Sequence, residues 1–136
     1  QSKKAEKKIQ QFIVEVKNKY NLKNSQICLS GFSQGCMMSI NLGIIIEEKF
    51  NCVVGFSGKI IDQVDLANRK ISSTKMLLIH GDRDAVVSPT FLLEAKDFLI
   101  RNNIKVETQM IKNCEHNIPI EASSKALNYI KSNFKI

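Results

Sequence analysis

QICLSGFSQG, residues 26–35, sets a short run of strand-forming residues directly before a glycine-rich turn. The residues that follow, to about Lys49, predict a helix. Within the turn, Gly31-Phe-Ser33-Gln-Gly35 matches the pattern G-x-S-x-G at the point where strand passes into helix. A serine on so sharp a turn projects its hydroxyl above the sheet, and a glycine on either side leaves room for crowded backbone. The motif alone also fits an ordinary turn whose serine caps the helix, so the rest of the chain decides between these two interpretations.

Predicted strands and helices alternate along the rest of the chain. Short apolar runs at 52–56 and 76–80 predict strands that are covered on both faces, and a further strand is expected at about 105–111. Helices are expected over 9–20 and after each of the two prolines. The apolar face of the first helix carries Ile9, Phe12, Ile13, Val16 and Tyr20, and that of the last carries Leu127, Ile130 and Phe134. This alternation predicts an α/β protein with a mostly parallel sheet.

The composition narrows the class of protein. The chain has 136 residues, of which 43% are apolar and 24% charged, as in a folded domain and unlike a disordered or collagen-like chain. No apolar run approaches the roughly 18 residues needed to span a bilayer. The net charge is +7, and the first 23 residues carry seven Lys, but without arginine or interleaved aromatic residues. We therefore expect a protein that neither spans a membrane nor binds nucleic acid.

The four cysteines indicate a reducing compartment. They lie at 28, 36, 52 and 114, without a CxxC pair or the Cys/His spacing of a zinc site. Cys28 and Cys52 fall within apolar, strand-like runs, where a free thiol packs as a small buried side chain. We expect no disulfide, no bound metal and a cytoplasmic location.

Ser33 needs a base to act as a nucleophile, usually a histidine that a carboxylate orients. The chain has two histidines. His80 ends the third predicted strand and begins the sequence HGDRD, which supplies Asp82 and Asp84, whereas His116 lies in the loop before the last predicted helix. Each residue has an ordinary explanation by itself, and the two histidines and two aspartates could instead form the metal site of a hydrolase. With Ser33, however, they all follow the carboxyl ends of predicted strands, where the sites of α/β proteins form.

With these residues the chain resembles the carboxylesterase/phospholipase family of α/β-hydrolases, which includes the acyl-protein thioesterases. GFSQG at 31–35 is similar to the family's turn around the nucleophile, FSG at 56–58 to the segment after its next strand, and HGDRDAVV at 80–87 to its acid loop. The order Ser, Asp, His along the chain is that of α/β-hydrolases. In the acid loop the resemblance implies that Asp82 braces the backbone and that His80 is structural.

The resemblance also implies the reaction. Ser33 would be the nucleophile, His116 its base and Asp84 the carboxylate that orients His116. The backbone N–H of Gln34 would stabilise the oxyanion. The expected reaction is hydrolysis of small carboxylic esters, thioesters or lysophospholipid-like acyl esters through an acyl-enzyme, without a cofactor or a metal.

The chain differs from the family in three respects. Cys36 and Glu115 stand where the family usually has glycine, and the resemblance starts only at the helix before the nucleophile strand. Residues 1–136 are therefore expected to form a single truncated α/β-hydrolase domain that lacks the N-terminal strands of the sheet. A second oxyanion donor lies in a loop after an early strand in such enzymes, and loss of one donor costs about 10²- to 10³-fold in rate. We expect this chain alone to have little or no esterase activity, and the alternative is a catalytically inactive remnant.

Overall fold

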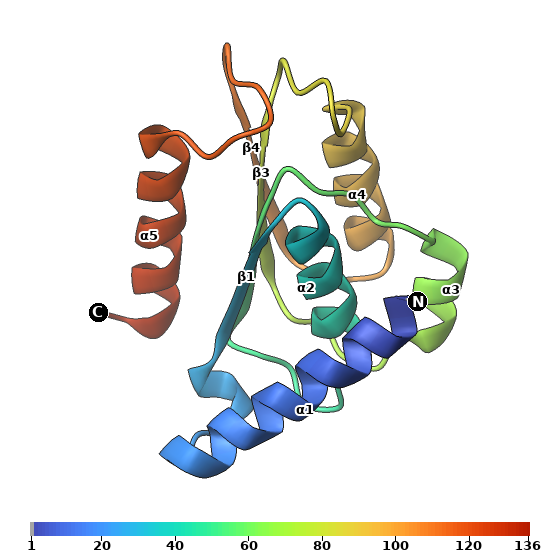
Figure 1. The fold of residues 1–136 in the computed structure, drawn as a ribbon, viewed down its shortest axis with the longest axis vertical. Helices are drawn as coiled ribbons and strands as arrows, with labels where there is room; N and C mark the ends of the chain where they lie inside the picture. Colours follow the sequence, from blue (N-terminus) through green and yellow to red (C-terminus); the bar gives the residue numbers. More distant parts are fainter. Residues whose placement is uncertain (1) are drawn as a thin grey trace.

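Four parallel strands in the order β1-β2-β3-β4 form the centre of the fold (Figure 1). The computed structural model describes residues 2–136. In chain order the elements are α1 (Ser2–Tyr20), the short 3-10 turn η1 (Asn24–Gln26), β1 (Cys28–Phe32), α2 (Gln34–Ile45), β2 (Cys52–Phe56), α3 (Gln63–Arg69), β3 (Met76–Gly81), α4 (Thr90–Arg101), β4 (Val106–Ile111) and α5 (Ile120–Phe134). The predicted α/β class with a parallel sheet is confirmed.

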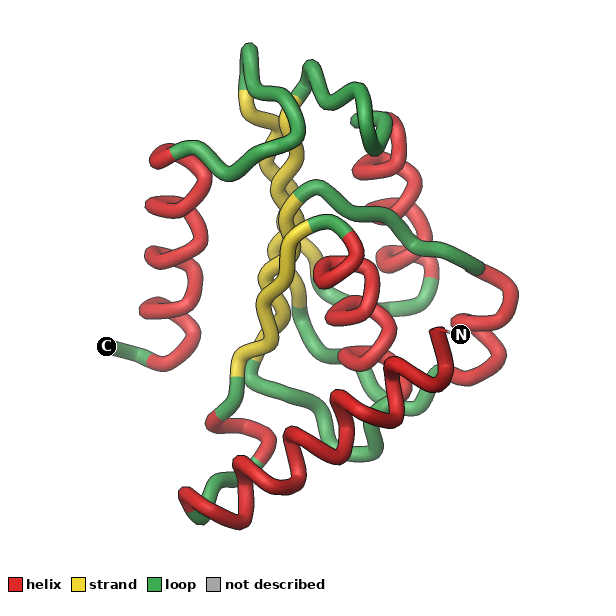
Figure 2. Tube along the Cα trace, viewed as in Figure 1, coloured by secondary structure: helices red, strands yellow, loops and turns green. Residues whose placement is uncertain are grey.

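Helices cover both faces of the sheet (Figures 1 and 2), with α5 on one face and α2 and α4 on the other. Alternate strand residues point to opposite faces. Val53 and Leu78 pack in the cluster that includes α2 and α4, whereas Val54 and Leu77 pack in the cluster that includes α5. Every residue of β2 and β3 is consequently buried, which explains why these strands are apolar up to His80 near the end of β3.

The carboxyl ends of the strands meet at one edge of the sheet. Phe32 pairs with Phe56, Phe56 with Ile79, and Gly81 with Ile111. The loops that follow β1, β3 and β4 therefore start side by side, although they are far apart in the sequence. This register brings the serine turn and the two predicted loops within reach of one another.

Helix α1 packs on α2 and leaves a groove beside β1. Ile13 of α1 is buried against Leu42 and Phe50, as its place in the predicted stripe requires. Phe12, from the same stripe, is 63% exposed and lines the groove. The groove has a volume of about 330 Å³ and is lined mostly by apolar side chains, including Ile9, Val16, Leu29 and Met38. Only part of the predicted apolar face of α1 is therefore covered within residues 2–136.

A buried ion pair fixes α1 to its neighbours. Glu6 is 2% exposed, and its carboxylate accepts hydrogen bonds from Arg69 Nη2 of α3 at 2.6 Å and from Asn41 Nδ2 of α2 at 3.1 Å. Both Glu6 and Asp65 raise the pKa of Arg69, mainly through the hydrogen bond with Glu6. Three helices thus meet at one carboxylate. None of the helices described in residues 2–136 is both long and apolar enough to cross a bilayer.

Three details differ from the sequence-based expectations. Helix α2 ends at Ile45, short of Lys49. Helix α3 was not expected, because in its seven residues only Leu66 is buried and no apolar periodicity develops. Helix α5 rests on the sheet mainly through Ala122 and Ala126, with Tyr129 and Ile130 packed beside them. Of the predicted apolar residues of α5, Leu127 is instead 56% exposed.

Candidate active site

Ser33 occupies the turn between β1 and α2 in a strained backbone conformation. Its φ is 57° and its ψ is −114°, a region that non-glycine residues rarely adopt and that is common at functional sites. The turn is held by main-chain hydrogen bonds, from Ser33 N–H to the carbonyl of Phe56 at 2.8 Å and from Met37 N–H to the carbonyl of Ser33 at 3.1 Å. Ser33 stands at the N-cap position of α2, but its side chain makes no capping bond. The hydroxyl is therefore available to another partner, which disfavours the helix-cap interpretation.

The two glycines of the motif have different structural roles. A Cβ on Gly31 would lie 2.2 Å from the carbonyl carbon of Gly35, so position 31 has no room for a side chain. A Cβ on Gly35 would meet nothing within 4 Å. The expectation that both glycines relieve crowding is therefore correct for Gly31 and wrong for Gly35, because the outer side of the first turn of α2 faces the groove beside β1.

Cys36, one of the departures from the family pattern, fills a space that two other glycines leave. A Cβ on Gly55 or on Gly58 would lie 2.4 Å or 2.5 Å from Cys36 Sγ. The thiol is 2% exposed, and this burial raises its pKa to about 12. The side chain thus packs the start of α2 against the loop after β2 and remains a neutral thiol.

Asp84, in the loop after β3, presents one oxygen to the loop and the other to His116. Its Oδ1 accepts hydrogen bonds from the backbone N–H groups of Val86 at 2.9 Å and Val87 at 2.8 Å. The residue is 5% exposed, and this desolvation by itself raises the carboxyl pKa. The hydrogen bonds from His116, Val87 and Val86 favour the charged form more strongly, so the pKa of Asp84 is lowered overall. Asp84 is thus an ionised carboxylate in a fixed orientation.

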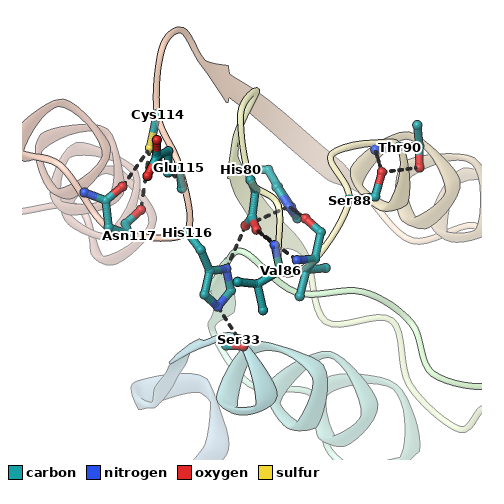
Figure 3. A network of polar contacts seen from close by, with 11 residues as sticks. Ser33, His80, Val86, Ser88, Thr90, Cys114, Glu115, His116 and Asn117 are labelled. Atoms are coloured by element: carbon teal, nitrogen blue, oxygen red, sulfur yellow. Dashed lines mark hydrogen bonds and ion pairs between the residues drawn. The ribbon is translucent and has the colours of Figure 1, made fainter.

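His116 joins the acid to the serine. Its Nδ1 lies 2.7 Å from Asp84 Oδ2 and its Nε2 lies 3.1 Å from Ser33 Oγ. Figure 3 shows the imidazole directed at Ser33. Because the ionised Asp84 accepts the Nδ1–H, Nε2 is free to accept the Ser33 hydroxyl proton. The three residues singled out in the sequence therefore lie in one hydrogen-bonded chain.

His80 supports the acid loop from beneath. It is 2% exposed, and its Nε2 lies 2.8 Å from the carbonyl of Val87 and 3.4 Å from Asp84 Oδ2. Because a carbonyl only accepts hydrogen bonds, Nε2 carries a proton and closes the loop around Asp84. This contact agrees with the structural role expected of His80. Asp82 braces the same loop through its backbone, whose N–H donates to the carbonyl of Ile111 at 3.0 Å.

The acid loop is also joined to the histidine loop, residues 112–119 between β4 and α5. Arg83 N–H donates to the carbonyl of Cys114 at 2.9 Å. Gly81 permits this approach, since a Cβ there would lie 2.2 Å from the same carbonyl oxygen. Glu115, where the family usually has glycine, does not need a left-handed backbone, because that conformation falls on Asn113 with φ 56°. An asparagine tolerates it well, so Glu115 does not strain the loop before His116.

Two further features bear on the chemistry. Gln34 is the first residue of α2, so its N–H belongs to the first helical turn, whose donors have no partner within the helix. Among residues 2–136, no three His, Cys, Asp or Glu side chains converge as metal ligands, so the alternative of a metal site formed by His80, Asp82, Asp84 and His116 has no donor set. The sequence alone did not reveal a contact between the rings of Phe32 and His116, whose centroids are 4.7 Å apart.

This chain is similar in sequence and fold to known esterases and thioesterases. The sequence profile described as phospholipase/carboxylesterase matches residues 1–134. Acyl-protein thioesterase 1 of Yarrowia lipolytica is 31% identical over 120 residues, which is 82% of this chain and 51% of that protein. The crystal structure of esterase PE8 aligns with a TM-score of 0.94 at 27% identity, over 96% of this chain and 61% of that one. The Bacillus cereus carboxylesterase aligns with a TM-score of 0.80 at 18% identity, over 94% and 59%.

The alignments cover only part of the length of each relative. This chain spans about half of the length of the thioesterase, at 51%, and 61% of esterase PE8. The expected fold, the C-terminal part of an α/β-hydrolase sheet, is confirmed by these alignments.

Proposed function

This chain belongs to the phospholipase/carboxylesterase family, and from that starting point we propose that it carries the reactive centre of a serine hydrolase for carboxylic esters or thioesters. The observation that carries the proposal is the hydrogen-bonded chain from Ser33 Oγ to His116 Nε2 at 3.1 Å and from His116 Nδ1 to Asp84 Oδ2 at 2.7 Å. Both distances fall in the range that nucleophile, base and orienting acid require.

The proposed reaction proceeds through an acyl-enzyme. Ser33 Oγ attacks the acyl carbonyl carbon while His116 Nε2 takes the hydroxyl proton. The ionised Asp84 holds the imidazole through Nδ1 and stabilises the imidazolium that forms. The backbone N–H of Gln34 donates to the oxyanion. His116 then returns the proton to the departing alcohol or thiol, and a water molecule, activated by the same base, releases the acid. These steps need no cofactor or metal.

The substrate and the setting are part of the same proposal. The relative named as a thioesterase favours acyl thioesters, and lysophospholipid-like acyl esters present the same reacting carbonyl. All four cysteines are free thiols, which favours a reducing, cytoplasmic compartment. The sequence supplies one oxyanion donor, Gln34, so we propose that residues 1–136 form a truncated domain that turns over slowly or not at all by itself.

Labelling with a fluorophosphonate tests the nucleophile without requiring turnover. The parent chain, Ser33→Ala and Ser30→Ala are incubated with the probe and compared by intact mass. Ser30 is an exposed serine three residues earlier on β1, so it is the matched control. We expect one adduct on the parent and on Ser30→Ala, and none on Ser33→Ala.

Other outcomes would contradict the assignment. An adduct that maps to Ser30, Ser39 or Ser57, or labelling that survives Ser33→Ala, would exclude Ser33 as the nucleophile.

Hydrolysis of a short p-nitrophenyl ester by the same three proteins measures turnover. A complete lack of labelling on a folded parent chain would favour the inactive remnant instead.

A further inference from the structure

Phe32, the last residue of β1, packs its ring against the imidazole of His116. The two ring centroids are 4.7 Å apart and the ring planes are inclined by 45°. Phe32 directly precedes Ser33, and its side chain is 39% exposed. It belongs to none of the three buried clusters found among the described residues. The core therefore does not account for an aromatic side chain at this position, whereas the contact with His116 does.

The contact supplies a restraint that the hydrogen bonds of His116 lack. Asp84 Oδ2 and Ser33 Oγ bind the two nitrogens of the imidazole. Both bonds lie near the ring plane, so together they fix the position of the ring and the direction of the line through its nitrogens. They resist rotation about that line only weakly, because hydrogen bonds tolerate a broad range of angles. The Phe32 ring, tilted by 45° with its centroid 4.7 Å from that of the imidazole, limits this rotation by steric contact.

The contact also responds to charge. The face of a phenyl ring carries negative electrostatic potential and attracts a cation within about 6 Å of its centroid. When His116 takes the proton of Ser33 it becomes an imidazolium, and the 4.7 Å separation lies within this range. An interaction that strengthens as the charge develops favours the transition state over the resting enzyme.

We propose that Phe32 is a positioning residue for His116. Its ring holds the plane of the imidazole and stabilises the protonated form of His116. The catalytic consequence rests on the proposed function, but the ring contact is testable without turnover. Phe32 itself does not touch the reacting atoms and acts only through His116.

The charged and titratable surroundings of His116 stay the same when Phe32 is replaced. Asp84 and Ser33 face the imidazole from the acid loop and from the serine turn. Cys114 and Glu115 lie on the histidine loop itself, and Asp82 is close enough to influence the Cys114 thiol. The two loops also carry the cations Arg83, whose backbone N–H donates to the carbonyl of Cys114, and Lys112. A change measured at His116 in a Phe32 variant therefore reports the loss of the ring.

NMR of the histidine ring protons tests the contact directly, because the chain has only two histidines and His116→Gln identifies their signals. Phe32→Leu removes the aromatic face and keeps an apolar side chain, whereas Phe32→Tyr keeps the face. In Phe32→Leu we expect the ring-current shift of the His116 ring protons to disappear, because the aromatic ring that causes it is gone. Phe32→Tyr should retain this shift.

Controls separate this effect from a general loss of aromatic packing. Phe12→Leu removes a phenylalanine that is 63% exposed on α1 and should leave both histidine signals unchanged. If the NMR spectrum of Phe32→Leu loses its chemical-shift dispersion, that variant is unfolded and Phe32→Ile is used in its place. Chemical shifts of the His116 ring protons that are the same in the aliphatic variant and in the parent would overturn the proposal.

The catalytic consequence has a separate readout. The rate of fluorophosphonate labelling should fall about 2- to 5-fold in Phe32→Leu and recover in Phe32→Tyr. Equal labelling rates in Phe32→Leu and the parent would overturn this part of the proposal. If no variant and not even the parent is labelled, the proposed function fails, while the NMR experiment still decides whether Phe32 positions His116.

Discussion

Replacement of Gly31 by alanine is expected to disrupt the serine turn. The added Cβ would lie 2.2 Å from the carbonyl carbon of Gly35, 2.3 Å from its oxygen and 2.7 Å from the nitrogen of Cys36. All three are backbone atoms of the first turn of α2, which cannot rotate away as the end of a side chain can. To lengthen the 2.2 Å approach to an ordinary contact of about 3.5 Å, the helix must move by roughly 1.3 Å from β1.

The expected cost follows from the overpacking of well-packed interiors, which is about 1 to 3 kcal/mol and more when backbone must shift. Alanine also lowers the conformational entropy of the unfolded chain, which offsets about 0.4 to 1 kcal/mol of this cost. Because backbone atoms must shift, the cost falls at the upper end of the range, and we expect the free energy of unfolding of Gly31→Ala to fall by about 2 kcal/mol. The same displacement should lengthen the 3.1 Å contact between Ser33 and His116 and slow fluorophosphonate labelling.

Urea denaturation followed by circular dichroism measures the change, and Gly35→Ala is the matched control. A Cβ on Gly35 meets nothing within 4 Å, and the position lies in α2, where alanine is favoured over glycine by about 0.5 to 1 kcal/mol. Gly35→Ala should therefore be as stable as the parent or more stable. Equal stabilities for the two variants, or a change below about 0.5 kcal/mol for Gly31→Ala, would refute the steric argument.

Two further predictions concern charged groups. The pKa of Asp84 is lowered by its hydrogen bonds despite burial, so its stabilising effect is complete above the unfolded value of about 4 and is lost as the pH falls through the folded value. The stability advantage of the parent over Asp84→Asn should accordingly shrink below about pH 4 in urea titrations, and a constant difference would contradict this linkage. Glu6→Gln should cost about 2 kcal/mol in unfolding free energy, because Arg69 and Asn41 lose a buried carboxylate partner. The exposed pair of Asp97 with Arg101 provides the control, since Asp97→Asn should change stability by less than about 1 kcal/mol, and equal losses would remove the role assigned to burial.

The sheet was predictable because its pattern is local. The continuous apolar runs of β2 and β3 indicate burial on both faces, and the alternation with helices implies parallel strands. Parallel strands in turn place the loops after β1, β3 and β4 at one edge. The proximity of Ser33 to the HGDRD loop and to the histidine loop therefore follows from the sequence.

The finer choices within the site did not follow from residue patterns. Asp82 and Asp84 lie two positions apart in one loop, and only the resemblance to a family distinguished them. The structure shows the physical basis of the difference, since the N–H groups of Val86 and Val87 converge on Asp84. The role of Gly35 was inferred from the motif and was wrong, because crowding depends on which side of the helix faces open space.

Contacts between distant segments were likewise inaccessible to pattern analysis. Glu6 and Arg69 are 63 positions apart, and nothing in the sequence around either residue indicates a buried ion pair. The ring contact between Phe32 and His116 depends on the path of the loop after β4. No local signal specifies such a path, because loops are shaped by what they pack against.

The backbone connection between the acid loop and the histidine loop has a consequence for how this site can evolve. The bonds from Asp82 to Ile111 and from Arg83 to Cys114 use only main-chain atoms, while the side chains of Asp82, Arg83 and Glu115 are exposed. Substitutions at these exposed positions leave the main-chain bonds intact. Charge and bulk in the two loops can therefore change over evolution without altering the spacing of Ser33, Asp84 and His116.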